Sequence, residues 1–156
     1  SWLLVSLFIN GMTMIEIIEC KPDDLPELSL LWEKMISEVM LDAKPNKEWW
    51  ANYIRSFMAH GDYKCFKAVD NGVAIAFIDG SLFADPSIGE IIAIGLNFYV
   101  LPEYRGIIGA RLYLKLVREG KARGAKHIDL ICYKKTVSLW DKFKMDSVRY
   151  VMRKAL

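Results

Sequence analysis

The stretch that decides the fold is NFYVLPEYRGIIGARL, residues 97–112. It reads as the end of an apolar strand, a proline turn, a loop with two glycines and the first turns of an amphipathic helix. Glycines at a strand-to-helix turn let several backbone N–H groups converge without a Cβ in the way, and the positive end of the helix dipole reinforces them. The stretch therefore predicts a loop that binds phosphate groups.

Short strands and helices alternate on both sides of this stretch. Asn71-Gly72 between two apolar runs predicts a β-hairpin, and the apolar run 91–100 predicts a central strand buried on both faces. Asp24, with Glu27 three residues later, is expected to cap the first helix. The full expected order is a strand at 15–20, helices at 24–40 and 47–60, strands at 63–69, 73–78 and 91–100, a helix at 106–123, a strand at 128–133, a helix at 137–144 and a strand at 148–152. This order predicts an α/β domain in which helices cover a mixed sheet.

The composition is that of one domain. The chain has 156 residues, of which 53% are apolar, and this is enough to build a hydrophobic core. Residues 12–156 are expected to form the domain and residues 1–11 to be an extension outside it. The apolar segment 1–10 lacks the basic start and cleavage site of a signal peptide, and it is shorter than the about 20 residues that cross a bilayer. No membrane partner is therefore expected.

The net charge of +2 hides two unequal halves. Residues 1–102 carry 7 Lys and Arg against 14 Asp and Glu, whereas residues 103–156 carry 14 against 5. The basic half suits a ligand with several phosphates, because it adds to the glycine loop the cations Arg105, Arg111, Lys115 and Arg118. It lacks the aromatic interleaving and groove-reading helix of nucleic-acid binders, so no nucleic acid is expected as a partner. The acidic half suits a cationic partner.

The cysteines and histidines predict neither a disulfide framework nor a metal site. Cys20, Cys65 and Cys132 are odd in number and far apart, and His60 and His127 have no ligand spacing around them. A reducing, cytoplasmic compartment is the expected location.

Residues 100–110, VLPEYRGIIGA, together with the order of elements, resemble the GNAT superfamily of acetyl-CoA-dependent N-acetyltransferases. The resemblance covers roughly residues 14–152, and the family signature is V-x-P-x-[YF]-[RQ]-x-x-G-x-[GA]. The signature is matched at Val100, Pro102, Tyr104, Arg105 and Gly106. The resemblance implies a mixed, mostly antiparallel central sheet flanked by helices. It also implies transfer of an acetyl group from acetyl-CoA, the cosubstrate, directly to a primary amine of a small molecule or protein, with no metal.

By position, the resemblance implies a strand whose backbone pairs with the pantetheine arm of coenzyme A and a loop whose amides hold its pyrophosphate. The cosubstrate-binding residues so implied are Phe98, Tyr99, Val100, Arg105, Gly106, Ile107, Ile108, Gly109, Ala110 and Arg111. One family glycine is missing. In the ungapped register Ile108 stands in its place, and a register one residue shorter puts Gly109 at the final glycine of the signature.

The catalytic residues depart from the family pattern. Residues 136–145 resemble the family segment whose tyrosine often protonates the departing thiolate, but Trp140 stands there, and an indole N–H is not a useful acid. Seven residues before the position of Trp140 the family usually has an asparagine, and this sequence has Tyr133 there. Tyr133 is the candidate acid in place of the family tyrosine. Glu90, at the start of the central strand, is the candidate base for the amine. Asn97, a polar residue in an apolar strand, either orients the substrate or marks a β-bulge.

Two functions therefore stay open on this fold. The first is an N-acetyltransferase whose acidic first two helices and hairpin receive the amine, and the second is a non-catalytic coenzyme A-binding module. Trp140, Tyr133 and the missing glycine are the reasons for the second. The aromatic stripe of the second helix is expected to be core, with at least one of Trp49 and Trp50 buried. A homodimer is compatible with either function.

Overall fold

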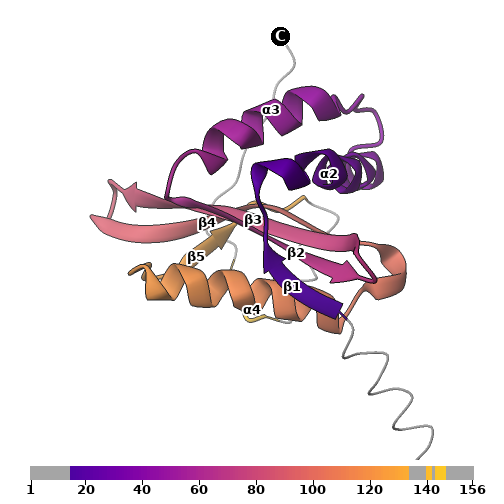
Figure 1. Ribbon diagram of the computed structural model, residues 1–156. Coiled ribbons are helices and arrows are strands. Elements are labelled where there is room, and N and C mark those ends of the chain that lie inside the picture. Colours follow the sequence, from indigo (N-terminus) through magenta and orange to yellow (C-terminus); the bar gives the residue numbers. More distant parts are fainter. Residues whose placement is uncertain (1–14, 134–139, 142, 147–156) are drawn as a thin grey trace, which may run out of the picture.

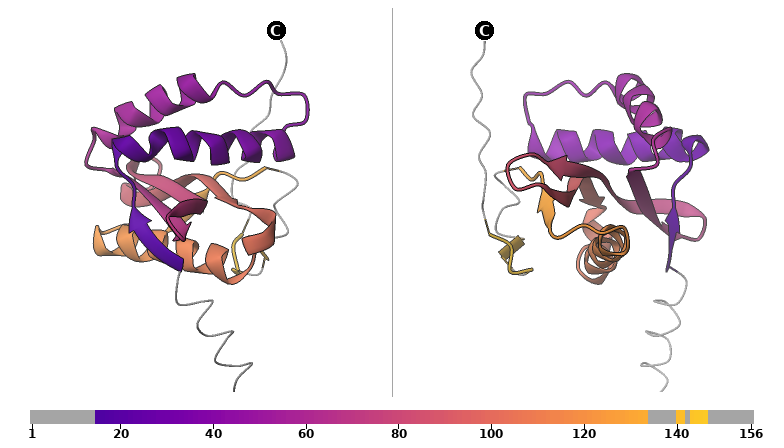
Figure 2. Two further views of the ribbon diagram at one scale, coloured as in Figure 1. Left: turned by 45° about the vertical axis from the view of Figure 1, so that its right-hand side comes forward. Right: turned by 90° about the vertical axis from the view of Figure 1, so that its left-hand side faces the viewer.

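In the part of the chain that the structure describes, five strands form one sheet between two layers of helices. The structure, a computed structural model, describes residues 15–133, 140–141 and 143–146. Helices α2 and α3 cover one face of the sheet and α4 covers the other (Figure 1), and the rotated views of Figure 2 show the same three layers. The strands are β1 (Ile15–Glu19), β2 (Tyr63–Asp70), β3 (Val73–Asp85), β4 (Glu90–Val100) and β5 (Ile128–Leu130).

The sheet has the strand order β1-β2-β3-β4-β5. Neighbours from β1 to β4 run antiparallel, and β5 runs parallel to β4. The parallel pair requires a crossover connection, which α4 provides on one face of the sheet. The α/β class and the mixed, mostly antiparallel sheet expected from the sequence are thus confirmed.

The helices form where apolar residues recur at helical spacing and polar residues mark the ends. They are α2 (Leu25–Val39), α3 (Lys47–Met58) and α4 (Ile107–Ala122), with short 3-10 turns η1 (Pro22–Asp24) and η2 (Pro102–Tyr104). Asn46 caps α3, because its side chain accepts a hydrogen bond from the Trp49 backbone N–H at 3.0 Å. Gly124, with φ at +89°, adopts the left-handed conformation that ends a helix such as α4.

Each face of the sheet has its own core. On the α2 and α3 face, Leu25, Leu28 and Trp50 pack with Phe77 of β3. On the α4 face, the core residues include Phe66, Ile78, Val100, Ile108 and Leu112. A fully buried side chain of this size contributes about 1.5–3 kcal/mol to stability, so the two cores hold the helical layers on the sheet.

The predicted hairpin is confirmed at Asn71-Gly72, where both residues have positive φ, at +48° and +81°. The paired strands are longer than expected, since β3 continues to Asp85. The strand expected at 128–133 ends at Leu130. The extension 1–11 and the strand 148–152 lie outside the described residues, as does half of the helix expected at 137–144.

Asp24 is the N-cap residue of α2, as expected, but its side chain makes no capping hydrogen bond to this helix, and Glu27 does not complete a capping box. Asp24 caps the 3-10 turn η1 instead, because its Oδ2 accepts from the Lys21 backbone N–H at 2.7 Å. Glu27 reaches across to the sheet, where its carboxylate accepts from the Ala74 N–H at 2.6 Å and from the Lys67 ammonium at 2.8 Å. Contacts between distant segments outweigh the local cap here.

The two tryptophans of α3 divide as expected. Trp50 is buried and stacks on Trp32, with ring centroids 5.3 Å apart. Trp49 is 61% exposed and stacks on Tyr53 along the outer face of the helix. The aromatic stripe is therefore core on one side and surface on the other.

We expect Gly80→Ala to destabilise the fold by about 1–3 kcal/mol, because there is no room for a side chain where β3 meets β4. A Cβ on Gly80 would lie 2.7 Å from the backbone oxygen of Ile94. Gly61→Ala is the matched control, since a Cβ there meets nothing within 4 Å. Urea unfolding of both variants measures the difference, and equal midpoints would contradict the close approach.

Candidate functional site

The central feature of the candidate site is an edge of β4 that β5 leaves uncovered. β5 pairs with β4 only from Ala93 to Gly95, and the Ile131 N–H donates the next hydrogen bond to the Gly95 oxygen at 2.9 Å. β4 continues to Val100 with β3 on its other side. Within the part of the chain that the structure describes, the second half of β4 therefore has a free hydrogen-bonding edge.

A β-bulge changes which backbone groups face this edge. Asp79 pairs with Asn97 and Gly80 with Gly95, so that Leu96 is an extra residue in β4. Before the bulge, Ala93 and Gly95 bond toward β5.

After the bulge the alternation is reversed. Leu101 donates to the Ile75 oxygen of β3, so the backbone groups of Phe98 and Val100 face away from β3. The Val100 oxygen accordingly accepts from Arg105 Nε rather than from a strand. Of the strand residues expected to pair with a ligand, Phe98 and Val100 present their backbone to the open edge, while Tyr99 is turned toward β3.

The glycine loop leads directly into α4. Gly106 has φ at +115° and is the N-cap of the helix, whose first internal bond runs from the Ala110 N–H to the Gly106 oxygen at 3.2 Å. The N–H groups of Ile107, Ile108 and Gly109 precede that bond, and no side chain caps them among the described residues. They form an uncapped helix N-terminus beside the end of β4, which is suited to an anion.

Close packing explains the position of Gly109. A Cβ there would lie 3.2 Å from Phe98 Cζ and 3.6 Å from Val100 Cγ2. The absence of a side chain lets the first turn of α4 approach the open part of β4. The loop and the edge are thus held side by side.

The expected cations are partly used within the protein. Arg105 donates through Nη2 to both carboxylate oxygens of Glu38 at 2.7 Å, and its guanidinium lies 5.7 Å from the Tyr99 ring centroid. Arg111 bonds the Ile15 oxygen at 3.2 Å, and Lys115 lies over the Phe66 ring at 5.2 Å. Arg105 is therefore the cation that connects the loop to α2.

Glu38 also accepts from the Tyr99 hydroxyl at 3.1 Å. Burial raises the pKa of Tyr99, and the neighbouring Glu38 carboxylate raises it further. The phenol is therefore a neutral hydrogen-bond donor at physiological pH. The link from α2 through Glu38 to Tyr99 and Arg105 ties one helical layer to the glycine loop.

Asp79 is a functional candidate that sequence reasoning missed. It is fully buried, and it accepts from the Tyr63 hydroxyl at 2.6 Å and from Asn97 through both its backbone N–H and its side-chain amide. Asn97 thus marks the bulge, one of the two readings of this residue. The available signal was a carboxylate that directly follows the apolar run at 74–78.

The proposed acid and base lie in different places. Tyr133 packs against the same core cluster as Leu96 and Tyr99, close to the bulge. Glu90 is the first residue of β4, where it pairs with Asp85. At about 3.3 Å per residue, its Cα is roughly 23 Å along the strand from that of Asn97. The structure brings Tyr133, Tyr99 and Asn97 to one region and leaves Glu90 at the opposite end of the strand.

Trp140 lies on the α4 face of the same region. Its ring is 5.2 Å from that of Phe98 and 6.0 Å from that of Tyr113. Its indole Nε1 is buried without a hydrogen-bond partner among the described residues. A buried donor without a partner costs about 1–3 kcal/mol, which is a reason to expect an acceptor from outside the described chain.

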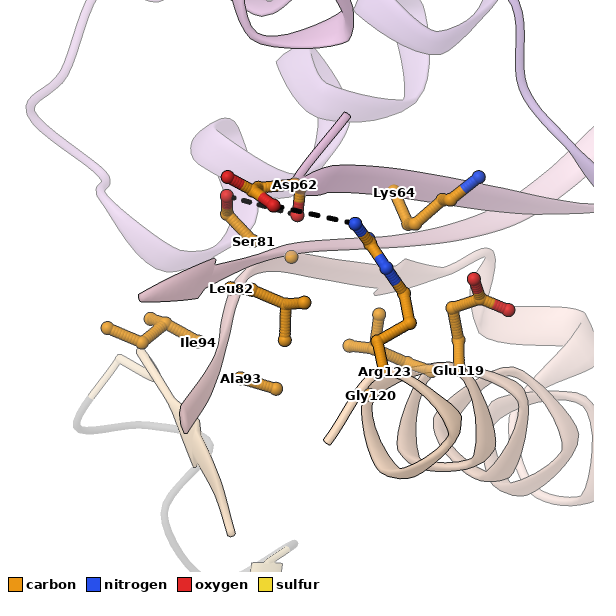
Figure 3. A pocket seen from close by; sticks show the side chains of 11 residues that line it. Asp62, Lys64, Ser81, Leu82, Ala93, Ile94, Glu119, Gly120 and Arg123 are labelled. Carbon is orange, nitrogen blue, oxygen red and sulfur yellow. Dashed lines mark hydrogen bonds and ion pairs between the residues drawn. The ribbon is translucent and has the colours of Figure 1, made fainter. Parts of the chain in front are cut away.

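A surface pocket lies away from this region, at the other end of α4 (Figure 3). Arg123 spans it and donates to the Gly61 oxygen. It also pairs with Asp62 at 3.5 Å, which a dashed line in Figure 3 marks. Gly120 and Leu116 form its α4 wall. At 1.5 Å per residue, Gly120 is about 20 Å along the helix from Ile107, so this pocket is separate from the glycine loop.

Two further searches bear on the class of site. Among residues 15–133, 140–141 and 143–146, no group of three or more His, Cys, Asp or Glu side chains is placed to hold a metal ion. No helix in that part of the chain is long and apolar enough to cross a membrane.

Comparison with known proteins identifies one family. A profile of the acetyltransferase (GNAT) family matches residues 27–144. Among solved structures, a predicted acetyltransferase from Clostridium acetobutylicum, crystallised with acetyl-CoA, is 18% identical with a TM-score of 0.78, covering 91% of this chain and 96% of that chain. A putative acetyl transferase from Pyrococcus furiosus is 20% identical with a TM-score of 0.75, covering 91% and 99%. An aminoglycoside N-acetyltransferase in complex with CoA is 15% identical with a TM-score of 0.74, covering 91% and 94%. No curated protein matches by sequence.

The buried carboxyl of Asp79 should make stability depend on pH. Burial raises its pKa to about 6, from 3.8 for an exposed Asp, although the hydrogen bonds from Tyr63 and Asn97 act in the opposite direction. Between these two values the folded protein holds a proton that the unfolded chain has lost, so this group lowers stability as pH rises. Burial also raises the pKa of Tyr63 and Cys65, so neither ionises in this range.

We therefore expect Asp79→Asn to gain stability relative to the parent as pH rises from 4 to 7, by roughly 3 kcal/mol at most. Denaturant unfolding of both proteins across that range measures the difference. A constant difference would show that Asp79 has an ordinary pKa. Asp42→Asn, at an exposed position in the turn after α2, is the control.

Proposed function

Since the chain belongs to the acetyltransferase (GNAT) family, we propose that it is an N-acetyltransferase that moves an acetyl group from acetyl-CoA to a primary amine of a small molecule or protein. Acetyl transfer follows from the family, and the amine acceptor is the proposal. The observation that supports binding of acetyl-CoA is the open edge of β4 beyond Gly95, which lies beside an uncapped helix N-terminus. Together they provide strand pairing for an extended amide-bearing arm and N–H donors for a pyrophosphate.

The residues that would hold the cosubstrate divide between these two elements. The N–H groups of Ile107, Ile108 and Gly109 would bind the pyrophosphate, with the positive end of the α4 dipole behind them. The backbone of Phe98 and Val100 would pair with the pantetheine arm. When bound, acetyl-CoA supplies an acetyl thioester, whose carbonyl carbon is attacked by the amine nitrogen to give an amide and the free thiol.

The backbone would also assist the reaction. The N–H groups of Phe98 and Val100 face the open edge, so either one can donate to an oxygen on which negative charge develops. The N–H of Tyr99, between them, is turned toward β3 and does not face the edge. No particular side chain is required for this step.

The acceptor is expected on the face of the sheet that α2 and α3 cover. Residues 1–102, which include α2 and α3, carry 14 Asp and Glu against 7 Lys and Arg, and this excess remains although Glu33 pairs with Lys47 and Glu38 with Arg105. A protonated amine would be drawn to this side by the negative field. This charge supports cationic amines as a class and does not distinguish polyamines, lysine side chains and aminoglycosides.

We propose a reducing compartment such as the cytoplasm as the location, and the state of the cysteines supports it. Cys20, Cys65 and Cys132 are all unpaired thiols, of which the first two are buried. We propose a homodimer as the assembly, which sedimentation would test.

Binding and turnover can be measured separately. We expect acetyl-CoA and coenzyme A to raise the melting temperature by several degrees at millimolar concentration, and duplex DNA to leave it unchanged. We expect thiol release with at least one amine from a panel of polyamines, lysine peptides and aminoglycosides.

Gly106→Ala serves as the site control, because its φ of +115° strains any side chain there and should weaken binding several-fold. No shift with either ligand would refute the proposed function. A shift without turnover on any amine would favour the second candidate, a non-catalytic coenzyme A-binding module, which Trp140 at the position of the family tyrosine also favours.

Tyr133 is proposed to protonate the departing thiolate. We expect Tyr133→Phe to lower kcat by about 100-fold or more, with little change in the KM for acetyl-CoA, because positioned acids contribute at least that factor. The control is Tyr113→Phe, since Tyr113 lies on α4 and packs against Trp140 and Phe143. Unchanged turnover of Tyr133→Phe would assign Tyr133 to packing only.

A further inference from the structure

The bulge in β4 needs a hydrogen-bond acceptor that the sheet does not provide. A bulge disrupts the ladder locally, so a backbone N–H beside the extra residue loses its usual carbonyl partner. Here the extra residue is Leu96, and the Asn97 N–H follows it. That N–H donates to Asp79 Oδ1 at 2.7 Å, so a side chain replaces the missing carbonyl.

The surroundings of Asp79 are built for an acceptor. Its side chain is fully buried on the α2 and α3 face of the sheet. Both oxygens receive donors, since Oδ2 accepts from the Tyr63 hydroxyl at 2.6 Å and the Asn97 amide reaches Oδ2 at 2.9 Å and Oδ1 at 3.1 Å. Such a satisfied buried network specifies a single local geometry.

The direction of the open edge depends on this geometry. Without the extra residue at Leu96, the alternation set by Ala93 and Gly95 would continue along β4. The backbone groups of Phe98 and Val100 would then face β3, and those of Tyr99 would face the edge. Pairing with an arm bound at the edge would shift by one residue relative to the glycine loop.

We propose that Asp79 is a positioning residue that holds the β4 bulge through the Asn97 N–H and so sets which backbone groups of β4 meet the cosubstrate. The inference has a structural half, that Asp79 holds the bulge, and a cosubstrate half, that the bulge sets the pairing with coenzyme A. The cosubstrate half rests on the proposed function. Asp79 touches no reacting atom in this arrangement. The Asn97 N–H requires a hydrogen-bond acceptor at position 79 and does not require a negative charge there. Burial raises the pKa of Asp79, which shows that the charge itself is costly there.

This requirement distinguishes two substitutions of similar size. Asp79→Asn keeps one oxygen for the Asn97 N–H, and its amide can donate to the Tyr63 oxygen, so the bulge is retained. Asp79→Leu removes both the buried charge and the acceptor, and leaves the Asn97 N–H without a partner. We expect coenzyme A affinity within threefold of the parent for Asp79→Asn and at least tenfold weaker for Asp79→Leu.

The bulge itself can be read in the protein without coenzyme A. Amide hydrogen exchange by NMR should show the Asn97 N–H protected in the parent and in Asp79→Asn, and exchanging at least tenfold faster in Asp79→Leu. Tyr63→Phe removes a donor from Oδ2 without touching the Asn97 N–H, so it is the matched control, with affinity and protection both retained.

The outcomes separate this inference from the proposed function. Parent-like affinity and Asn97 protection in Asp79→Leu would overturn the inference, and so would loss of both in Asp79→Asn. If Asp79→Leu does not fold, Asn97→Ala decides: it keeps the backbone N–H bond to Asp79, so a tenfold loss of affinity would overturn the role of that bond. A parent protein that does not bind coenzyme A would refute the proposed function and the cosubstrate half, while exchange at Asn97 would still decide the structural half.

Discussion

The hydrogen bond between the Asp79 carboxylate and the Asn97 backbone N–H is the interaction on which the arrangement of the site depends. An antiparallel strand offers its backbone alternately to its two neighbours. A single extra residue reverses this alternation, and the reversal persists only if the displaced N–H finds another partner. A buried carboxylate on β3 is that partner, so the orientation of the open edge is decided inside the core.

The site that results is built mainly from backbone. Phe98 and Val100 contribute strand groups, and Ile107 to Gly109 contribute the N–H groups of a helix start. Such groups bind amides and phosphates whatever the side chains are, provided that nothing blocks the approach. Gly109 keeps the approach clear, because its missing Cβ lets α4 pack on Phe98. The chain shares its fold with structures to which it is only 15–20% identical, and a candidate site of this kind depends on backbone position more than on side-chain identity.

Local signals predicted local structure well. The Asn71-Gly72 turn requires positive φ at both positions, which few other residues adopt easily. These two residues were therefore enough to predict the hairpin. The helices expected at 47–60 and 106–123 likewise begin and end beside local signals, the Asn46 cap and the positive φ of Gly124. Asp24 is the N-cap residue that the sequence predicted, but the capping box with Glu27 is not formed. The spacing of a capping box does not reveal that Lys67 and the Ala74 N–H lie within reach of Glu27. The role of Asp79 was not predicted, because its partners Tyr63 and Asn97 are 16 and 18 residues away along the chain.

The sequence by itself determined the order of strands and helices from residue 15 to residue 130, the glycine loop before α4 and the division of charge between the two halves. These properties depend on residues that are near one another along the chain, or on composition. Only the tertiary structure decided that β5 leaves the second half of β4 uncovered, that Arg105 pairs with Glu38, and that Glu90 lies at the far end of the strand from Asn97. Register and long-range pairing decide these features, because one residue of shift in a strand exchanges its two hydrogen-bonding edges, and no local pattern of residues records that shift.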